Sequence, residues 1–263
     1  MHFDAFDSYV PGRSRVHRLD PRVKLLSCLL YILSVVLMPD GAWSGLGAAW
    51  LIVLGTGALA GMDLRLLLKR SLVALPFALA ALTLPFTLPG EPIASWQIGG
   101  TVISISDAGL LRFGGIVVRS WLAVQAAVLL TATTHFPDLI HGLRHLRVPD
   151  LITGILSFMY RYVFVLADEA LRLLRGRAAR SAVGPAGTSG PGPPIRWRAR
   201  AAGGMVGQLF LRSLDRSDRV HYAMQSRGYT GDLLTMNPHH MTRADWLALA
   251  LAGALALVPH LLV

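Results

Sequence analysis

Long apolar runs constrain the fold of this chain more than any other feature of its sequence. A helix needs about 20 mostly apolar residues to cross a bilayer. Five runs approach that length, at residues 25–38, 41–62, 72–88, 108–131 and 246–263. Hydrophobic residues make up 53% of the chain and charged residues only 15%, well below the share of about 25% that is typical of soluble domains. The sequence therefore predicts an all-α integral membrane protein with about five transmembrane helices.

The lysines and arginines alternate between the segments that join these runs. Five lie in residues 1–24 and three in residues 63–70, whereas the loops around residue 40 and over residues 89–107 contain none. A further 15 lie in residues 135–243. Because basic residues are retained on the cytoplasmic side of a membrane protein, we expect a cytoplasmic N-terminus, a long cytoplasmic segment and a C-terminus on the outside.

This pattern divides the chain into three parts. A membrane part with four spans covers residues 1–134, a cytoplasmic helical region covers residues 135–243, and a last span covers residues 244–263. A further apolar run at residues 151–167 contains Arg161, and an arginine at midspan costs on the order of 3 kcal/mol. A sixth crossing would also divide the basic residues between both sides, so we expect this run to pack against the bundle from the cytoplasmic side.

Two long helices are predicted within the cytoplasmic region. The first begins at Asp150 and continues to about Arg180, with Glu169 and Arg172 at the spacing of an ion pair on one helix face. Residues 182–194 follow with four glycines and four prolines, a composition that predicts a flexible connection. Apolar residues at uneven helical spacing indicate a second helix over residues 195–227.

Each of these helices is expected to end in an arginine between two small residues. The two tripeptides are Ala179-Arg180-Ser181 and Ser226-Arg227-Gly228. Small neighbours leave a guanidinium group free to enter a groove on another protein, where it pairs with carboxylates in bidentate geometry. An arginine at a helix end is also commonly a solvated cap, and the residues alone leave both interpretations open.

The sequence offers little support for an enzyme. It contains no GxxxxGK[ST] phosphate loop, and no Ser-His-Asp or paired-carboxylate arrangement stands out. Its one cysteine, Cys28, excludes an internal disulfide, and its nine histidines lack acidic or cysteine partners at metal-ligand spacing. Aspartates 215 and 218 between the arginines of the second helix favour a protein-docking surface over nucleic-acid binding. The residues alone therefore support neither catalysis nor a metal site in this chain.

Arg119 lies near the middle of the fourth apolar run and is the most unusual charge within the membrane part. It has no obvious carboxylate one turn away on its own helix. Ionisable residues within a span normally face the bundle interior and pair with another group. The sequence leaves open whether Arg119 pairs across the bundle or contacts a partner.

Four segments carry a resemblance to a known family. They are HRLDPRVKL (17–25), LRHLRVPDLI (143–152), FMYRYVFVLADEALRL (158–173) and LFLRSLDRSDRVHYAMQSRGYTGD (209–232). Together they resemble CbiQ, the transmembrane (EcfT-type) component of energy-coupling-factor (ECF) cobalt importers of the ABC transporter class. The LDPR start and the two arginine motifs are also similar to the scaffolds of vitamin importers, whereas the aromatic FMYRY form resembles the metal-transport branch more closely.

The resemblance implies a non-catalytic scaffold in the bacterial inner membrane that transmits ATPase motion to a separate substrate-capture subunit. It implies two CbiO-like cytoplasmic ATPase subunits that bind the ATP, a CbiM-like capture subunit and, as an optional partner, a small CbiN-like subunit. The ATPase-coupling residues carried over are Ala179, Arg180, Ser181, Ser226, Arg227 and Gly228. Residues expected to support coupling to the bundle are Arg161, Glu169 and Arg172. Cobalt is implied by the resemblance alone, and the alternatives are a nickel or vitamin ECF importer or, less favoured, an ordinary ABC permease that forms the substrate path.

Overall fold

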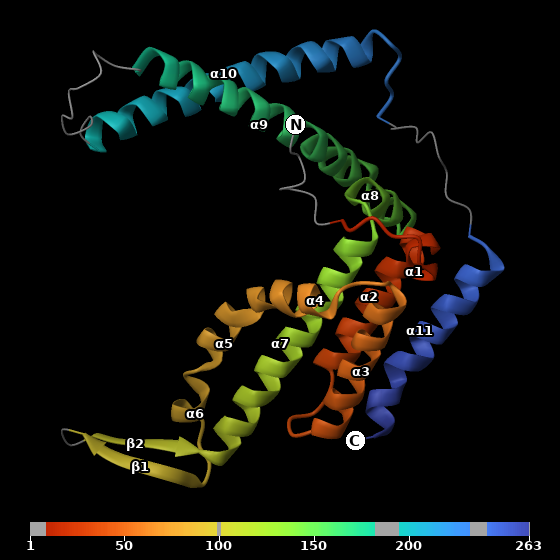
Figure 1. The fold of residues 1–263 in the computed structure, drawn as a ribbon, viewed down its shortest axis with the longest axis vertical. Helices are drawn as coiled ribbons and strands as arrows, with labels where there is room; N and C mark the ends of the chain where they lie inside the picture. Colours follow the sequence, from red (N-terminus) through yellow and green to blue (C-terminus); the bar gives the residue numbers. More distant parts are fainter. Residues whose placement is uncertain (1–8, 99–100, 182–194, 232–240, 263) are drawn as a thin grey trace. The chain divides into compact units, whose positions relative to one another are not determined.

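The computed structural model describes residues 9–98, 101–181, 195–231 and 241–262. Within these residues the chain is almost entirely helical and contains a single two-stranded sheet (Figure 1). It divides into two compact units, residues 1–146 with 237–263 and residues 147–236. The connection predicted at residues 182–194 lies outside the described residues.

Four helical segments are long and apolar enough to cross a membrane. They are Leu64–Thr87, Asp107–Thr133, Asp150–Ala179 and Arg243–Leu261. α3 (Trp43–Leu59) is a shorter apolar helix, and α2 (Pro21–Val36) has 16 residues. The prediction of an all-α membrane protein is therefore confirmed. The run at residues 151–167 belongs to one of these segments, Asp150–Ala179, which is long and apolar enough to cross a membrane. The distribution of basic residues around it nevertheless favours a position on the cytoplasmic side.

The core of the first unit forms where α2 contacts α3 and α7 (Asp107–Thr133). α11 (Arg243–Leu261) contacts both α2 and α3. Polar side chains inside this bundle bind backbone carbonyls of neighbouring helices, as with the hydroxyl of Tyr31, which donates to the carbonyl of Ala49 at 3.0 Å. Such hydrogen bonds hold membrane helices together where lipid removes the hydrophobic driving force between them. The buried residues of this core are Tyr31, Val35, Met38, Leu46, Ala49, Val53, Leu67, Leu122 and Ala126.

The third apolar run folds as a chain of short helices. α4 (Leu64–Ser71) continues through a 3₁₀ turn into α5 (Leu75–Ala81), and α6 (Leu84–Thr87) follows. Pro76 and Pro85 lie in the first turns of α5 and α6, where the missing N–H costs no hydrogen bond. Each of these two prolines therefore marks the start of a short helix.

A β-hairpin joins this run to α7 in place of the expected loop. β1 (Pro92–Ile98) pairs antiparallel with β2 (Thr101–Ser106), with Trp96 opposite Ile103 and a register shift between Pro92 and Ala94. Two runs rich in β-branched residues around a Gly-Gly pair are typical of a hairpin.

Arg119 pairs across the bundle. Its Nη2 atom lies 2.8 Å from Oδ1 of Asp40, in the loop between α2 and α3. Arg112, about two turns before Arg119 on α7, lies 3.9 Å from the same carboxylate. The carboxylate that was missing from the arginine's own helix therefore comes from a position 79 residues away, and Asp40 fastens the α2–α3 loop to α7.

Lys24 joins four segments at the N-terminal end of α2. Its side chain is buried, and its Nζ atom donates at 3.0 Å to the carbonyl of Thr133, the last residue of α7, and at 3.0 Å to that of His17 in α1 (Arg15–Arg18). The carboxylates of Asp138, in α8 (Phe136–His145), and of Asp20 lie close enough to attract its charge. A lysine in this position satisfies carbonyls that a helix end leaves open.

Asp20 and Asp245 extend this junction to α11. The carboxylate of Asp20 caps α2 by accepting from the N–H of Arg22 at 2.9 Å, and its own N–H donates to Asp245 at 3.0 Å. Asp245 forms a capping box with Thr242 at the start of α11. The LDPR segment thus caps α2 and connects its start with the start of α11, and Lys24, two residues after it, adds the end of α7.

Candidate functional site

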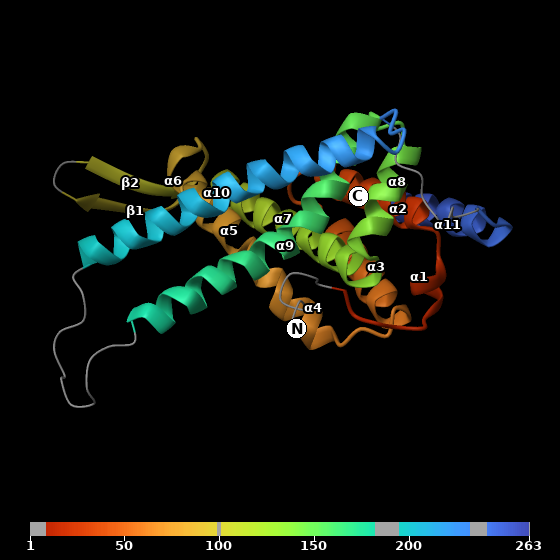
Figure 2. The ribbon, with the colours of Figure 1, turned by 90° about the horizontal axis from the view of Figure 1, so that it is seen from above.

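Two long helices make up the second unit. α9 (Asp150–Ser181) has 32 residues and α10 (Ile195–Gln225) has 31, so each is about 47 Å long. They cross as an antiparallel pair, with the last turn of α9 and the last turn of α10 at opposite ends (Figures 1 and 2). The two predicted arginine motifs are therefore separated along the length of this pair.

Glu169 links the two helices where they cross. Its carboxylate accepts from Arg172, one turn further along α9, and from Arg212 of α10. These two hydrogen bonds hold the pKa of the Glu169 carboxyl below its ordinary value. The ion pair predicted between Glu169 and Arg172 is present, and Arg212 is the partner that the sequence did not reveal, because it lies 43 residues away.

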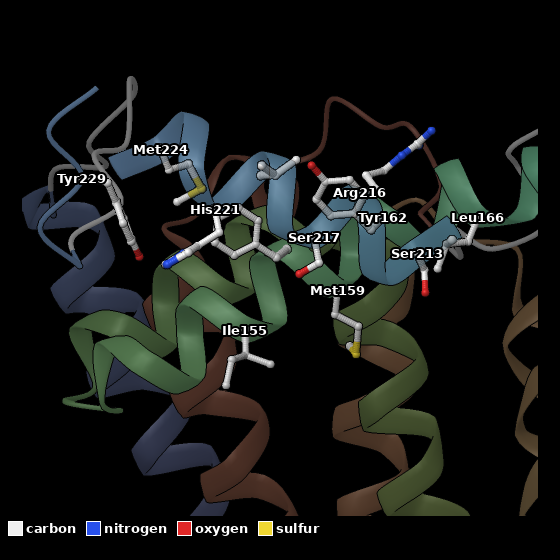
Figure 3. Close-up of a pocket in the computed structure, with 12 residues that line it drawn as sticks. Ile155, Met159, Tyr162, Leu166, Ser213, Arg216, Ser217, His221, Met224 and Tyr229 are labelled. Carbon is white, nitrogen blue, oxygen red and sulfur yellow. The ribbon is translucent and has the colours of Figure 1, made fainter. Parts of the chain in front are cut away.

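A cavity of about 520 Å³ opens between the first half of α9 and the second half of α10 (Figure 3). Aliphatic, aromatic and methionine side chains dominate the lining, and polar groups come mainly from α10. Methionine and aromatic side chains adapt to a partner's shape at low cost. The lining residues are Ile155, Phe158, Met159, Tyr162, Leu166, Ser213, Arg216, Ser217, Val220, His221, Met224 and Tyr229.

The second arginine motif is a Schellman helix end. The N–H of Tyr229 donates to the carbonyl of Met224 at 3.1 Å, and the N–H of Gly228 donates to the carbonyl of Gln225 at 3.0 Å. Gly228 has φ +80°, a left-handed conformation that glycine adopts without steric cost. Arg227 is consequently the last residue before the turn, and it is exposed. Gly228 therefore has a definite role in this motif, because it ends the helix directly after the arginine.

The first arginine motif occupies the last three residues of α9. Ala179 is exposed, and Arg180 and Ser181 lie in the final helical turn. The side chains of Arg180 and Ser181 lie outside the described structure, so their role stays a prediction. Arg161 is exposed on α9 and has no ion pair with any residue that the structure describes; its supporting role also stays a prediction.

Met224 and Tyr229 were not singled out by the sequence, although they connect the second motif to the cavity. Both line it, and they occupy the two positions of a Schellman motif whose side chains normally contact each other. The sequence signal that could have revealed them is a methionine four residues before a glycine, with an aromatic residue directly after that glycine. Within the described ranges, no group of three or more His, Cys, Asp or Glu residues is placed to hold a metal ion.

Gly228→Ala should loosen the end of α10. Alanine at φ +80° costs about 1–2 kcal/mol, so amide hydrogen exchange over residues 221–229 should accelerate about five- to thirtyfold. Gly204→Ala is the matched control, because Gly204 lies inside α10 with open space around it and alanine favours a helix interior. Equal exchange in Gly228→Ala and the unchanged protein would show that the glycine does not determine this helix end.

Comparisons with known proteins agree with this architecture. The family model described as "Cobalt transport protein", CbiQ, matches residues 12–238. The chain is 27% identical over 260 residues to the energy-coupling factor transporter transmembrane protein EcfT of Thermosediminibacter oceani, covering 94% of this chain and 93% of that protein. It is 28% identical over 232 residues to EcfT of Bacillus subtilis, covering 85% and 83%. It is 30% identical over 160 residues to the cobalt transport protein CbiQ of Rhodobacter capsulatus, covering 61% and 62%. The chain therefore belongs to the CbiQ family of cobalt transport proteins, the EcfT-type transmembrane components of energy-coupling-factor transporters.

Proposed function

We propose that this protein is the scaffold and coupling subunit of a cobalt importer, and that it carries out no catalysis itself. Two CbiO-like ATPase subunits would bind ATP and dock at its two arginine motifs, at residues 179–181 and 226–228. A CbiM-like membrane subunit, with a CbiN-like subunit as an optional partner, would capture the metal. The protein would lie in the inner membrane with its N-terminus in the cytoplasm, an orientation that the distribution of basic residues favours.

The observation that carries this proposal is the arrangement of α9 and α10. The first motif forms the last three residues of α9 and the second directly follows the end of α10, and each helix is about 47 Å long. The two motifs lie at opposite ends of the pair. A pair of ATPase subunits that closes on ATP would therefore move two separate points of contact. Glu169 ties the helices together between those points, so that motion of either end reaches the crossing.

Coupling to the capture subunit is assigned to the same pair of helices. The cavity between α9 and α10 offers an adaptable apolar surface, and Met159, which lines it, is 49% exposed. Exposed apolar surface of this kind marks a site of contact with another protein. We assign the face around this cavity to the capture subunit. We also propose that the connection at residues 182–194 accommodates a change in the angle between the two helices.

Cobalt is favoured as the substrate because the matching family model and one relative carry that name. A nickel or vitamin importer is the alternative, because several relatives are named as general EcfT components. An ordinary ABC permease is less favoured. Such a subunit would line its own spans with polar groups, whereas the shorter apolar helix α3 contains only Ser44 and Thr56 as polar side chains besides tryptophan.

The test is uptake of radiolabelled metal into proteoliposomes that contain this protein with its ATPase and capture subunits. We expect ATP-dependent cobalt uptake that requires all of the subunits, with nickel taken up more slowly. Uptake without the capture subunit would show that this chain forms the substrate path and would contradict the scaffold assignment. A preference for nickel or for a vitamin would change the assigned substrate from cobalt, but it would leave the scaffold role in place.

A further inference from the structure

Two arginines of the membrane part lie apart from every other basic residue of the chain. All remaining lysines and arginines lie in residues 1–24, 63–70 and 135–243, whereas Arg112 and Arg119 lie in the first half of α7. Basic residues are normally retained on the cytoplasmic side of a membrane protein. Two arginines towards the opposite end of a span therefore need a specific explanation.

Both arginines lie on the same side of α7. They are seven residues apart, which corresponds to two helical turns and a rotation of only about 20°. Gly115 lies between them, and a Cβ atom there would be 3.5 Å from Nη2 of Arg119 and 3.5 Å from Oδ1 of Asp40. The guanidinium group of Arg119 therefore extends about one turn towards Arg112, in the direction in which helical side chains tilt.

These guanidinium groups lie near the far edge of the hydrocarbon region. Thr133, whose carbonyl accepts from Lys24, ends α7 on the side that we assign to the cytoplasm. Measured from Thr133 along the helix axis, Gly115 lies at about 27 Å and Arg112 at about 31 Å. The hydrocarbon core of a bilayer is about 30 Å thick. The two guanidinium groups therefore reach the level at which the phosphate groups of the outer leaflet begin.

This cluster carries more positive than negative charge. Oδ1 of Asp40 accepts from Arg119 at 2.8 Å, and Oδ2 lies 3.9 Å from Nε of Arg112. Neither arginine has another ion pair with a residue that the structure describes. The bond to Asp40 uses one of the five N–H groups of Arg119, and its buried Nε has no hydrogen-bond partner among the described residues. One positive charge and several donors remain for an anion.

The surroundings favour a lipid as the source of that anion. The side chain of Arg112 is 55% exposed and that of Asp40 is 43% exposed, so the cluster is open to the outside of the bundle. Large apolar side chains are exposed beside it, namely Leu37, Trp43 and Leu111. Tryptophan is typical of the membrane–water interface. Exposed apolar groups next to arginines at this level match the acyl chains and the phosphate of a phospholipid.

We propose that Arg112 and Arg119 bind the phosphate group of an anionic phospholipid in the outer leaflet, with Asp40 orienting Arg119. Guanidinium groups bind phosphate oxygens through paired, charge-assisted hydrogen bonds. A lipid with one net negative charge balances the cluster, whereas a zwitterionic lipid brings a positive group of its own. The inference concerns the membrane part alone, so it stands or falls separately from the proposed coupling function.

The test titrates the purified full chain in neutral detergent with phosphatidylglycerol or phosphatidylcholine and counts the bound lipids by native mass spectrometry. We expect one saturable site that prefers phosphatidylglycerol about tenfold. Arg112→Gln/Arg119→Gln should weaken this binding about tenfold, because charge-assisted contacts with the phosphate are lost. Arg65→Gln/Lys69→Gln is the matched control, which removes two exposed charges from α4 and should change the affinity less than about twofold.

Asp40→Asn separates lipid binding from a purely structural role of the cluster. Asparagine keeps an oxygen that accepts from Arg119 but removes the charge that competes with the phosphate. The affinity for phosphatidylglycerol should therefore rise about threefold. If Arg112→Gln/Arg119→Gln does not fold, Arg112→Gln alone gives the same comparison, because its contact with Asp40 is the longer one; we expect it to weaken binding about threefold.

Four results would overturn the inference. The first is equal affinity of the unchanged protein for the two lipids, which needs no variant to interpret. The second is an equal loss of binding in the arginine variant and in the control. The third is displacement of the lipid by millimolar inorganic phosphate, which would identify a site for the free anion. The fourth is an arginine variant that binds phosphatidylglycerol normally but no longer holds the capture subunit, which would identify a protein as the partner.

Discussion

Lys24→Met should lower the melting temperature of the purified protein by about 5–10 °C. The substitution keeps the length and the apolar stem of the side chain but removes its charge and its hydrogen-bond donors. The carbonyls of Thr133 and His17 then lose their shared partner. Each buried polar group left unsatisfied costs about 1–3 kcal/mol. We expect this loss to exceed the gain from no longer burying a charged amine near Asp138 and Asp20.

The chain offers a matched control for this prediction. Its only other lysine is Lys69, which is exposed on α4, so Lys69→Met makes the same chemical change without removing a buried contact. We expect its melting temperature to shift by less than about 2 °C. The melting temperatures are measured by differential scanning fluorimetry. Equal shifts in the two variants would show that Lys24 does not fasten the end of α7.

The position of Lys24 also explains why the damage should spread beyond one helix. The lysine connects α1, α2 and the end of α7, and Asp20 beside it reaches the start of α11 through Asp245. α8 follows α7 after two residues, Thr134 and His135. Loss of this junction frees the end of α7 and the start of α8, so uptake by the proposed importer should fall together with stability.

The features that the sequence predicted well are local. The third apolar run breaks into short helices that begin at Pro76 and Pro85, because a proline affects only its own helical turn. The ends of α9 and α10 were foreseen from small residues, and Gly228 explains the second of them through its positive φ. Long apolar runs likewise identified three of the four span-capable segments, at residues 72–88, 108–131 and 246–263, whereas the runs at residues 25–38 and 41–62 form the shorter helices α2 and α3.

The features that it missed depend on distant parts of the chain. Arg119 pairs with Asp40, which lies 79 residues away in the sequence, and Arg212 pairs with Glu169, which lies 43 residues away. Helical spacing reveals neighbours only three or four residues apart, so neither pair was available from the pattern. The hairpin at Pro92–Ser106 was missed for another reason: its alternating signal is short, and the surrounding apolar helices dominate any hydropathy window.

Reversing the charge of both motif arginines should remove the ATPase from the complex. Arg227 follows the last turn of α10 and is exposed, and Arg180 holds the matching place on α9. In the proposed complex each guanidinium enters an ATPase groove and pairs with carboxylates there. A glutamate at that position repels the same carboxylates, and a reversed charge at a docking centre costs several kcal/mol, which corresponds to an affinity loss of about a thousandfold or more.

The central claim is tested most directly by detergent co-purification of the ATPase with the unchanged protein and with Arg180→Glu/Arg227→Glu. Arg216→Glu/Arg219→Glu serves as the control, because it reverses two charges on α10 away from the motifs. We predict that the unchanged protein and the control retain the ATPase and that Arg180→Glu/Arg227→Glu loses it. Retention of the ATPase by Arg180→Glu/Arg227→Glu would contradict the assignment of the docking sites, and failure of the unchanged protein to bind any ATPase would contradict the coupling function itself.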